Sequence, residues 1–118
     1  MTVIQTRINC NSEDFKKNYS FHQNLSIELK SLIKNIKKMG PFKNLEKHAN
    51  RRKLTARDRI SRLKDKDTEF LEFSELAAYK VYKDSIPAAG IITGIVIIKN
   101  RACIVIANDA TVKGGTYY

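Results

Sequence analysis

Four consecutive residues near the end of the sequence, Lys113-Gly114-Gly115-Thr116, combine a cation with a flexible backbone. Glycine has no Cβ, so a turn that contains two glycines lets the backbone approach a ligand closely. A neighbouring lysine can meet a phosphate group as a point charge. The same glycines could equally serve only to turn the chain after a predicted strand. The residues themselves leave both interpretations open.

A second group of candidate binding residues is basic and lies between Lys43 and Lys66. Its densest members are Arg51, Arg52, Lys53, Arg57, Arg59 and Arg62. Such a cluster could bind the phosphates of an acidic partner such as RNA and release their counterions. However, no aromatic residue for base stacking lies inside it, and no nucleic-acid motif is visible. A solvated helix face is therefore the favoured interpretation, and a standalone basic module that binds RNA is the alternative.

Residues that could carry other chemistry are few. The isolated histidines and cysteines are His22, His48, Cys10 and Cys103. They show no metal-ligand spacing and no Cys-x-x-Cys pair, so we predict neither a metal site nor a disulfide framework, and a reducing compartment is expected. Asn108 and Asp109 are expected to cap the turn that follows them rather than to act as an acid or base.

The charge of the chain divides it into two regions. Residues 1–66 hold 17 basic and 6 acidic side chains, whereas residues 67–118 hold 5 and 6. The apolar fraction of 42% is ordinary for a folded domain, and 118 residues suffice for one domain. We therefore predict a basic helical region over 1–66 and a separate domain that begins at residue 67.

The N-terminal region contains the periodicity of helices. Apolar residues recur at spacings of three and four over Asn24–Met39, and Gly40-Pro41 is a strong stop signal. A second helix is predicted over Phe42–Ala49. Thr55 and Asp58 form a weak capping box that predicts a third helix over Ala56–Lys64.

The second region has the pattern of strands. Phe70–Phe73 and Ala78–Tyr82 are predicted as brief strands. The β-branched runs Gly90–Ile98 and Arg101–Ala107 predict a hairpin whose turn is Lys99-Asn100. The fold class is therefore α+β, with N-terminal helices followed by a β-hairpin.

The first strand of this hairpin is apolar on both faces. Ile91, Ile95 and Ile97 point to one face, and Ile92, Val96 and Ile98 point to the other. The predicted helices can cover one face, but the eleven residues after the hairpin contain no helix pattern. We expect the other face to lack a covering layer within this chain, as in the front of a longer protein.

Four segments in the same order resemble the amino-terminal part of the carboxyltransferase subunits of biotin-dependent acyl-CoA carboxylases. The segments are Arg52–Ile60, Phe70–Glu72, Pro87–Ile95 and Ile106–Tyr118. The resemblance is closest to the β subunit of methylcrotonoyl-CoA carboxylase. It implies the incomplete front of a crotonase-like domain, a fold of repeated ββα units, in which a following helix covers the hairpin.

The resemblance also implies a function. Complete family members transfer a carboxyl group from carboxybiotin to an acyl-CoA, here the γ-carbon of 3-methylcrotonoyl-CoA in leucine catabolism, and their catalytic glycine-rich segments lie beyond the part matched by this chain. We therefore expect no catalysis and no bound cofactor in this chain alone. In the family, the turn matching Lys113, Gly114, Gly115 and Thr116 lies on the side where CoA binds, which makes these residues candidate CoA contacts.

The implied partners are the remainder of the carboxyltransferase subunit, the α subunit that carries biotin, and a CoA thioester. The sequence has no signal-peptide pattern, and its longest apolar stretch, Ile86–Ile98, is too short to span a membrane. A soluble, cytoplasmic protein is expected.

Overall fold

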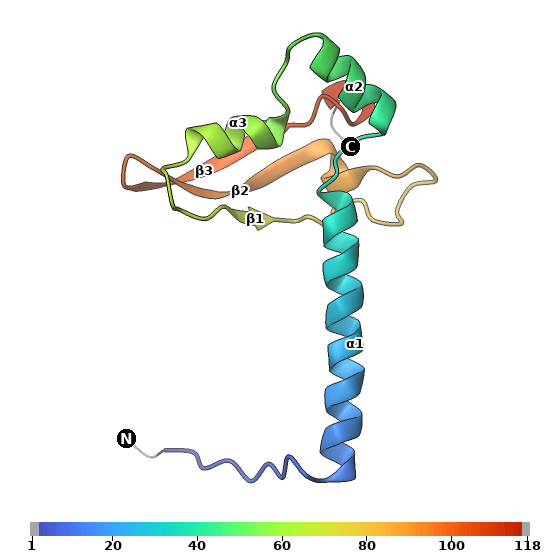
Figure 1. The fold of residues 1–118 in the computed structure, drawn as a ribbon, viewed down its shortest axis with the longest axis vertical. Helices are drawn as coiled ribbons and strands as arrows, with labels where there is room; N and C mark the ends of the chain where they lie inside the picture. The colour runs from blue at the N-terminus through green and yellow to red at the C-terminus, as the bar shows by residue number, and fades with distance from the viewer. Residues whose placement is uncertain (1–2, 117–118) are drawn as a thin grey trace. The chain divides into compact units, whose positions relative to one another are not determined.

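The computed structural model describes residues 3–116, which form three α-helices and a three-stranded sheet (Figure 1). The elements are α1 (Glu13–Ile36), α2 (Phe42–Asn50), α3 (Ala56–Leu63), β1 (Leu71–Phe73), β2 (Ile91–Ile98) and β3 (Arg101–Asn108), with short 3₁₀ turns at Pro87–Gly90 and Lys113–Gly115. None of the described helices is long and apolar enough to cross a membrane.

The chain divides into two units, Met1–Leu32 and Ile33–Tyr118. Packing thus divides the chain before α2 and α3, which belong with the strands, whereas the charge changes sign near residue 66. The predicted organisation into regions 1–66 and 67–118 rests on charge and stays a prediction.

Helix α1 begins eleven residues earlier than the predicted start at Asn24. The Ser12 hydroxyl accepts a hydrogen bond from the Phe15 N–H at 3.2 Å, which is an N-cap contact, and Glu13 and Asp14 occupy the first turn. The helix ends at Ile36 rather than at Met39, and residues up to the predicted Gly40-Pro41 stop form a turn. The apolar periodicity therefore did not predict the first part of α1. That part begins at an N-cap residue followed by two acidic residues.

Helices α2 and α3 match the predictions to within one residue. At the start of α3, the Thr55 hydroxyl accepts from the Asp58 N–H and the Asp58 carboxylate accepts from the Thr55 N–H, both at 3.1 Å. This is the capping box that the sequence predicted, and it satisfies two amides that the helix itself leaves unpaired.

The sheet has the order β1-β2-β3 with antiparallel pairing, and the predicted hairpin is confirmed. Lys99 and Asn100 have φ values of 49° and 61°, which is the left-handed pair of a type I′ turn. The carboxylate of Asp65 accepts hydrogen bonds from both of their N–H groups at 2.8 Å. These bonds lower the pKa of Asp65 and tie the loop after α3 to the hairpin turn.

The predicted strand over Ala78–Tyr82 is wrong, because these residues form successive turns. Ala78 and Lys80 have φ values of 63° and 57°, which an extended strand does not contain. Both edges of β2 are already occupied by β1 and β3, so no place beside the central strand remains for this segment.

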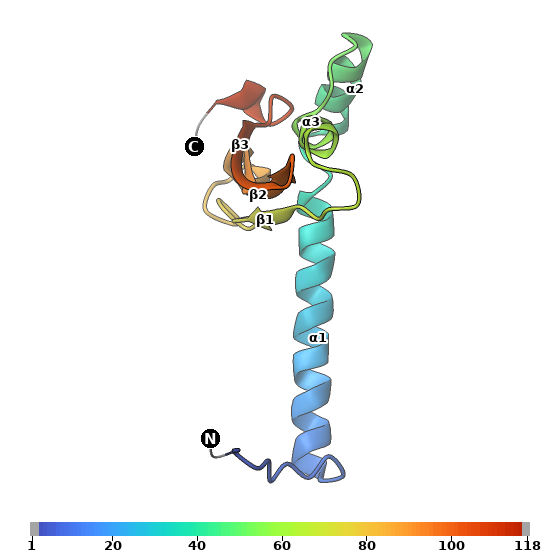
Figure 2. The ribbon, with the colours of Figure 1, turned by 90° about the vertical axis from the view of Figure 1, so that its left-hand side faces the viewer.

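Helix α3 lies along one face of the hairpin (Figures 1 and 2), and the core lies between the two. Ala56 and Ile60 of α3 pack against Ile92 and Val96 of β2, and all four are buried. The opposite face carries two exposed isoleucines of β3, Ile104 at 75% and Ile106 at 68% exposure. The predicted uncovered face is therefore confirmed within the described chain.

A charge cluster holds β1 to α3. The Glu72 carboxylate, whose side chain is only 4% exposed, accepts two hydrogen bonds from the Arg57 guanidinium at 2.7 and 2.6 Å. Lys37 lies 3.4 Å from the same carboxylate. Burial alone would raise the pKa of Glu72, but the hydrogen bonds and charges of Arg57 and Lys37 outweigh it and lower the pKa below its ordinary value.

Arg57→Ala is expected to lower the free energy of unfolding by about 3 kcal/mol, because the buried Glu72 carboxylate loses both hydrogen bonds from Arg57 and keeps the Lys37 ammonium, 3.4 Å away, as its counter-charge. Urea unfolding of the chain measures this loss. The lowered pKa means that Glu72 contributes stability above the pKa of about 4.3 of an unfolded glutamate and loses it as pH falls through the folded value. The difference between wild type and variant should therefore shrink as the pH is lowered below about 4.3.

Lys16→Ala is the matched control, because Lys16 and Glu13 form an exposed ion pair at 2.8 Å. The decrease in the free energy of unfolding caused by Lys16→Ala should stay below about 1 kcal/mol. Equal losses for the two variants, or a pH-independent loss for Arg57→Ala, would contradict the role given to Glu72.

The segment after β3 is anchored to α2 through Thr111, which is 1% exposed. The Gly40 N–H donates to the Thr111 hydroxyl at 3.1 Å, and the Asn44 side-chain amide donates to the Thr111 carbonyl at 2.9 Å. Asp109, itself buried, accepts from the Thr111 N–H and hydroxyl at 2.9 and 2.6 Å. The predicted capping role of Asp109 is thus confirmed, and α2 is fixed to a segment about seventy residues away.

Replacing Thr111 by Val should lower the free energy of unfolding by about 2–3 kcal/mol, because the buried Gly40 N–H loses its acceptor and Asp109 loses a donor. Thermal unfolding followed by circular dichroism measures this change. Thr93→Val is the matched control, because the Thr93 hydroxyl makes only a long contact of 3.4 Å with the Phe73 carbonyl. A loss at Thr111 no larger than that at Thr93 would show that this anchor contributes little.

Candidate functional site

The four predicted binding residues form one tight turn after β3. Lys113, Gly114 and Gly115 all have left-handed φ values, 46°, 75° and 87°. The Gly115 N–H donates to the Val112 carbonyl at 2.9 Å, and the Thr116 hydroxyl donates to the Lys113 carbonyl at 3.0 Å. Glycine adopts left-handed φ values without steric cost, so the conformation of the turn explains the two glycines.

The lysine of this turn pairs with a carboxylate. The Lys113 ammonium contacts the side chain of Asp84, which lies in the loop between β1 and β2. The hydrogen bond and charge of Lys113 lower the pKa of Asp84. Lys113 is therefore engaged with this loop rather than with the pocket that Gly114 lines.

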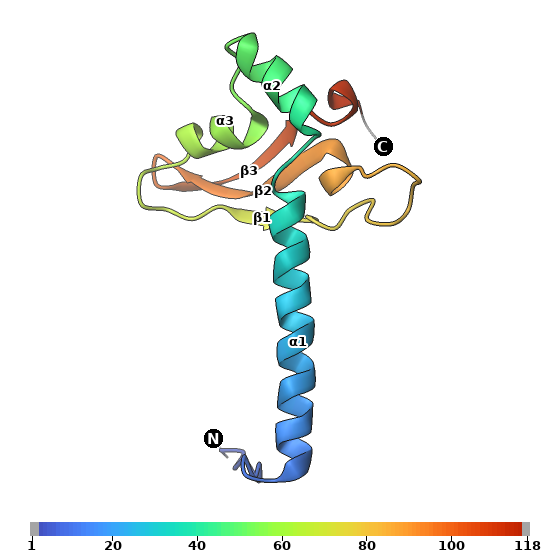
Figure 3. The same cartoon turned by 45° about the vertical axis from the view of Figure 1, so that its right-hand side comes forward.

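Gly114 borders a pocket of about 320 Å³ that we call the basic pocket. It is lined by Asn44, Lys47, His48, Arg51, Lys53, Ala110 and Gly114. A Cβ placed on Gly114 would meet no atom within 4 Å, so the backbone there is open. The Gly114 N–H also has no acceptor among the described residues. Figure 3 shows α2 near the segment after β3, and the hydrogen bonds of Thr111 join the two.

Helix α2 and its C-terminal cap place the cations of the basic pocket. Lys47 and His48 lie three and four residues after Asn44, so the three share one helix face. The helix ends in a Schellman motif, in which the N–H groups of Arg52 and Lys53 donate to the carbonyls of Ala49 and His48 at 2.7 and 3.2 Å. This reversal brings Lys53 back to the same pocket.

The basic pocket carries net positive charge. The side chains of Lys47, Arg51 and Lys53 make no ion pair or hydrogen bond with residues 3–116, and no acidic residue is among the described lining residues. The His48 Nε2 lies 3.0 Å from the Leu54 carbonyl. A carbonyl only accepts, so this nitrogen carries the proton and the ring is oriented by that bond.

The basic cluster predicted from the sequence is thus split by the fold. Arg57 is engaged with Glu72, and Arg59 donates to the Leu54 carbonyl at 3.3 Å. Arg51 and Lys53 instead line the basic pocket with Gly114. Sequence reasoning missed this pocket because Gly114 is about sixty residues from the cations, and no local signal links them.

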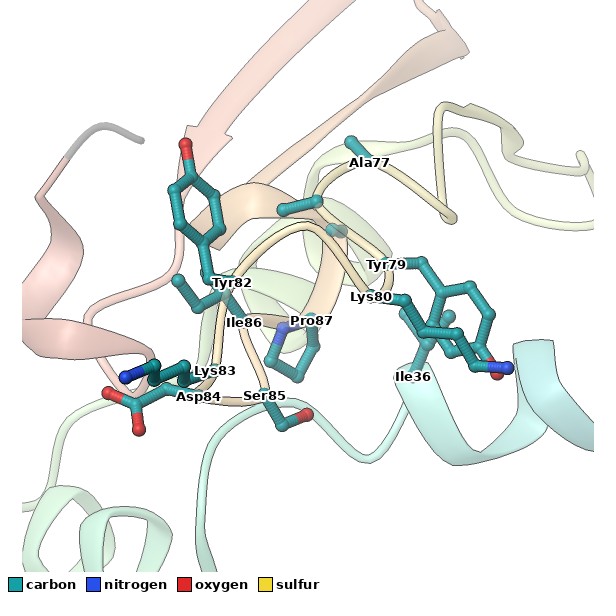
Figure 4. Close-up of a pocket in the computed structure, with 12 residues that line it drawn as sticks. Ile36, Ala77, Tyr79, Lys80, Tyr82, Lys83, Asp84, Ser85, Ile86 and Pro87 are labelled. Carbon is teal, nitrogen blue, oxygen red and sulfur yellow. The ribbon is translucent and has the colours of Figure 1, made fainter.

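A second pocket of about 230 Å³ lies along the loop between β1 and β2 (Figure 4). Tyr79 and Lys80 lie together next to Ile36, whereas Asp84 lies on another side of the pocket. Ala88 lines it with a left-handed φ of 49°. Its link to the predicted site is the Asp84–Lys113 ion pair.

Among the described residues, no group of three His, Cys, Asp or Glu side chains could hold a metal ion.

Comparison with known proteins finds relatives that are similar to this chain over most of its length. The mitochondrial methylcrotonoyl-CoA carboxylase beta chain of Arabidopsis thaliana is 41% identical over 116 residues, which cover 98% of this chain and 20% of that protein. The biotin-dependent 3-methylcrotonyl-coenzyme A carboxylase beta1 subunit of Mycobacterium tuberculosis is 45% identical over 97 residues, which cover 82% of this chain and 18% of that protein.

A solved structure gives the same relationship. The beta subunit of geranyl-CoA carboxylase from P. aeruginosa matches with a TM-score of 0.81 and 32% identity, over 99% of this chain and 22% of that chain. The predicted fold, the front of a crotonase-like carboxyltransferase domain, is confirmed. The chain spans about one fifth of the length of the curated relatives it matches.

The model of the carboxyl transferase domain matches residues 47–118, which include α3, the whole sheet and the turn at Lys113–Gly115. The match therefore covers more than half of the chain. The protein belongs to the carboxyl transferase domain family, and the two relatives named above are beta subunits of methylcrotonoyl-CoA carboxylases.

Proposed function

We propose that this chain is the N-terminal part of a carboxyltransferase subunit of the methylcrotonoyl-CoA type. The complete subunit would move a carboxyl group from carboxybiotin to 3-methylcrotonoyl-CoA, in leucine catabolism. The observation that carries this proposal is the identity of about 40% to methylcrotonoyl-CoA carboxylase beta chains over nearly the whole chain.

The chain alone is not expected to catalyse carboxyl transfer. The reaction passes through an enolate of the acyl-CoA, and its stabilisation by fixed N–H donors is the largest catalytic contribution. In the family these donors come from glycine-rich segments outside the part that this chain matches. Biotin would arrive on a separate α subunit, so we propose that this chain holds no cofactor of its own.

The remainder of the carboxyltransferase subunit is the first proposed partner, and it would cover the open face of the hairpin. Ile104 and Ile106 together expose enough apolar surface to make their burial worth a few kcal/mol, at about 25 cal/mol per Å². Isolated exposed isoleucines are common, but here they sit side by side on one strand of a sheet. Such a continuous apolar face favours a covering layer.

The turn at Lys113, Gly114, Gly115 and Thr116 is the proposed contact for the CoA thioester. Support comes from the open backbone at Gly114, whose left-handed turn leaves space for a ligand to approach. The relatives include mitochondrial and bacterial enzymes, and we propose a cytoplasmic location for this chain.

The test of this function is reconstitution. The chain alone should give no carboxyl transfer to 3-methylcrotonoyl-CoA in the presence of the biotin-carrying subunit of a relative. Addition of the remaining part of that relative's carboxyltransferase subunit should restore transfer, measured as incorporation of labelled bicarbonate. Ile106→Asp should reduce the restored rate at least tenfold, since about 1.4 kcal/mol of lost docking energy weakens assembly tenfold.

Ile8→Asp is the matched control, because Ile8 and Ile106 are both 68% exposed and only Ile106 lies on the sheet. This control should retain the restored rate. Two outcomes would contradict the proposal: turnover by the chain alone, or reconstitution that is equally sensitive to both variants.

A further inference from the structure

Strand β3 forms one edge of the sheet, and its outer side has no neighbouring strand among residues 3–116 (Figure 1). Ile98 and Arg101 flank the two-residue turn as a hydrogen-bonded pair, so every second residue of β3 directs its N–H and C=O groups to β2. The Asp109 N–H continues this alternation, because it donates to the Gly90 carbonyl at 2.8 Å. The other residues of β3 direct their backbone groups outward, and these are Ala102, Ile104, Ile106 and Asn108.

Most of these outward groups are unpaired. The N–H and C=O groups of Ala102, Ile104 and Ile106 have no hydrogen-bond partner among the described residues. The end at Asn108 is different, because its side-chain amide donates to the Gly115 carbonyl at 3.0 Å and the turn after β3 lies there. We call the stretch from Ala102 to Ile106 the open edge.

The open edge lacks the features with which proteins usually block an exposed strand. Its sequence contains no lysine, proline or other charged residue, and its pairing with β2 continues without a bulge. A regular apolar edge of this kind is a template for a further strand, which supplies the missing hydrogen bonds.

We infer that a second copy of this chain pairs with the open edge, antiparallel and about a two-fold axis at Ile104. Ile104 then lies opposite its own counterpart, and Ala102 of each copy lies opposite Ile106 of the other. Each of these three pairs exchanges two hydrogen bonds, so identical groups satisfy the whole edge. The inference concerns the edge of the sheet and does not depend on the proposed function, which concerns its face.

The side chains of the open edge favour this register. Ala102, Ile104 and Ile106 lie on the same face of the sheet and are exposed. The two-fold axis at Ile104 places the small Ala102 opposite the large Ile106, within the distance of about 5 Å at which opposite side chains interact. A shift by two residues would instead place Ala102 opposite Asn108, whose amide is already engaged.

The position of α3 leaves room for the second copy. The two-fold axis is perpendicular to the sheet, so both copies of α3 lie on the same side, each over its own β2-β3 pair. The midlines of the two pairs are two strand spacings apart, about 9.6 Å. Packed helices are separated by about 8–10 Å, so the two copies of α3 fit side by side. The opposite face of the extended sheet stays open for a covering layer.

The charge of the chain opposes this pairing and gives it a recognisable salt dependence. Each copy has a formal net charge of +10, so two copies repel each other. Salt screens this repulsion but leaves the backbone hydrogen bonds and apolar contacts in place. Dimerisation should therefore strengthen as salt is raised, whereas binding of an acidic partner such as RNA weakens.

The test uses the intact 118-residue chain over a series of micromolar concentrations. Sedimentation velocity should show a monomer–dimer equilibrium whose dissociation constant falls as sodium chloride is raised. Amide hydrogen exchange followed by NMR should slow with concentration at Ala102, Ile104 and Ile106. The pattern should alternate along β3, because the N–H groups of Cys103 and Val105 are already bonded to β2 in the monomer. This measurement on the wild-type chain requires no variant.

Ile104→Lys should weaken dimerisation at least tenfold, or about 1.4 kcal/mol, because it places two ammonium groups opposite each other. Leu71→Lys is the matched control. Leu71, Ile95 and Ile104 lie in one row across the sheet, so Leu71 shares the open face but belongs to the other edge. It is 61% exposed. The control should stay within about twofold of wild type, since its added charge is distant from the two-fold axis and is screened.

Four results would overturn the inference. The first is a wild-type chain that stays monomeric at every concentration and salt. The second is equal weakening by Ile104→Lys and Leu71→Lys, which would indicate association through the open face. The third is slowed exchange along β3 without alternation. The fourth is protection of the open edge only after the remaining part of a relative's subunit is added, because the edge would then belong to that part.

Discussion

The β2-β3 hairpin carries apolar side chains on both faces. The rest of the described fold depends on which face is buried and which is exposed. One face buries Ile92 and Val96 against α3, which explains why α3 must lie beside the sheet. The other face presents Ile104 and Ile106 to solvent. Strands that are apolar on both faces are typical of sheets covered on both sides, so the fold that the chain adopts is suited to receive a further layer.

Two polar junctions hold the helices to this sheet across long sequence separations. Arg57 of α3 binds Glu72 of β1, and Thr111 after β3 binds Gly40 and Asn44 at the start of α2. Gly40 has no alternative at this place, because a Cβ there would lie 2.0 Å from the Thr111 carbonyl oxygen. The second junction is also what creates the basic pocket, since it brings Gly114 to the cations of α2.

Features encoded by neighbouring residues could be predicted from the sequence, and those that depend on distant contacts could not. The Thr55–Asp58 capping box, the Lys99-Asn100 turn and the uncovered face were predicted correctly, because each follows from local spacing. The end of α2 has no glycine signal in the sequence, because its left-handed residue is Arg52. The basic pocket could not be predicted, because the Thr111 contacts that assemble it leave no local pattern.

The central claim is that one apolar face of the hairpin is open in this chain and becomes covered by another part of a carboxyltransferase subunit. Isoleucine methyl NMR with a soluble paramagnetic agent measures this directly, because the agent broadens only accessible methyl signals. In the isolated chain, Ile104 and Ile106 should be strongly broadened while Ile92, which is 2% exposed, is not. Addition of the remaining part of a relative's subunit should protect both. Protection of Ile104 and Ile106 equal to that of Ile92 in the isolated chain would contradict the claim.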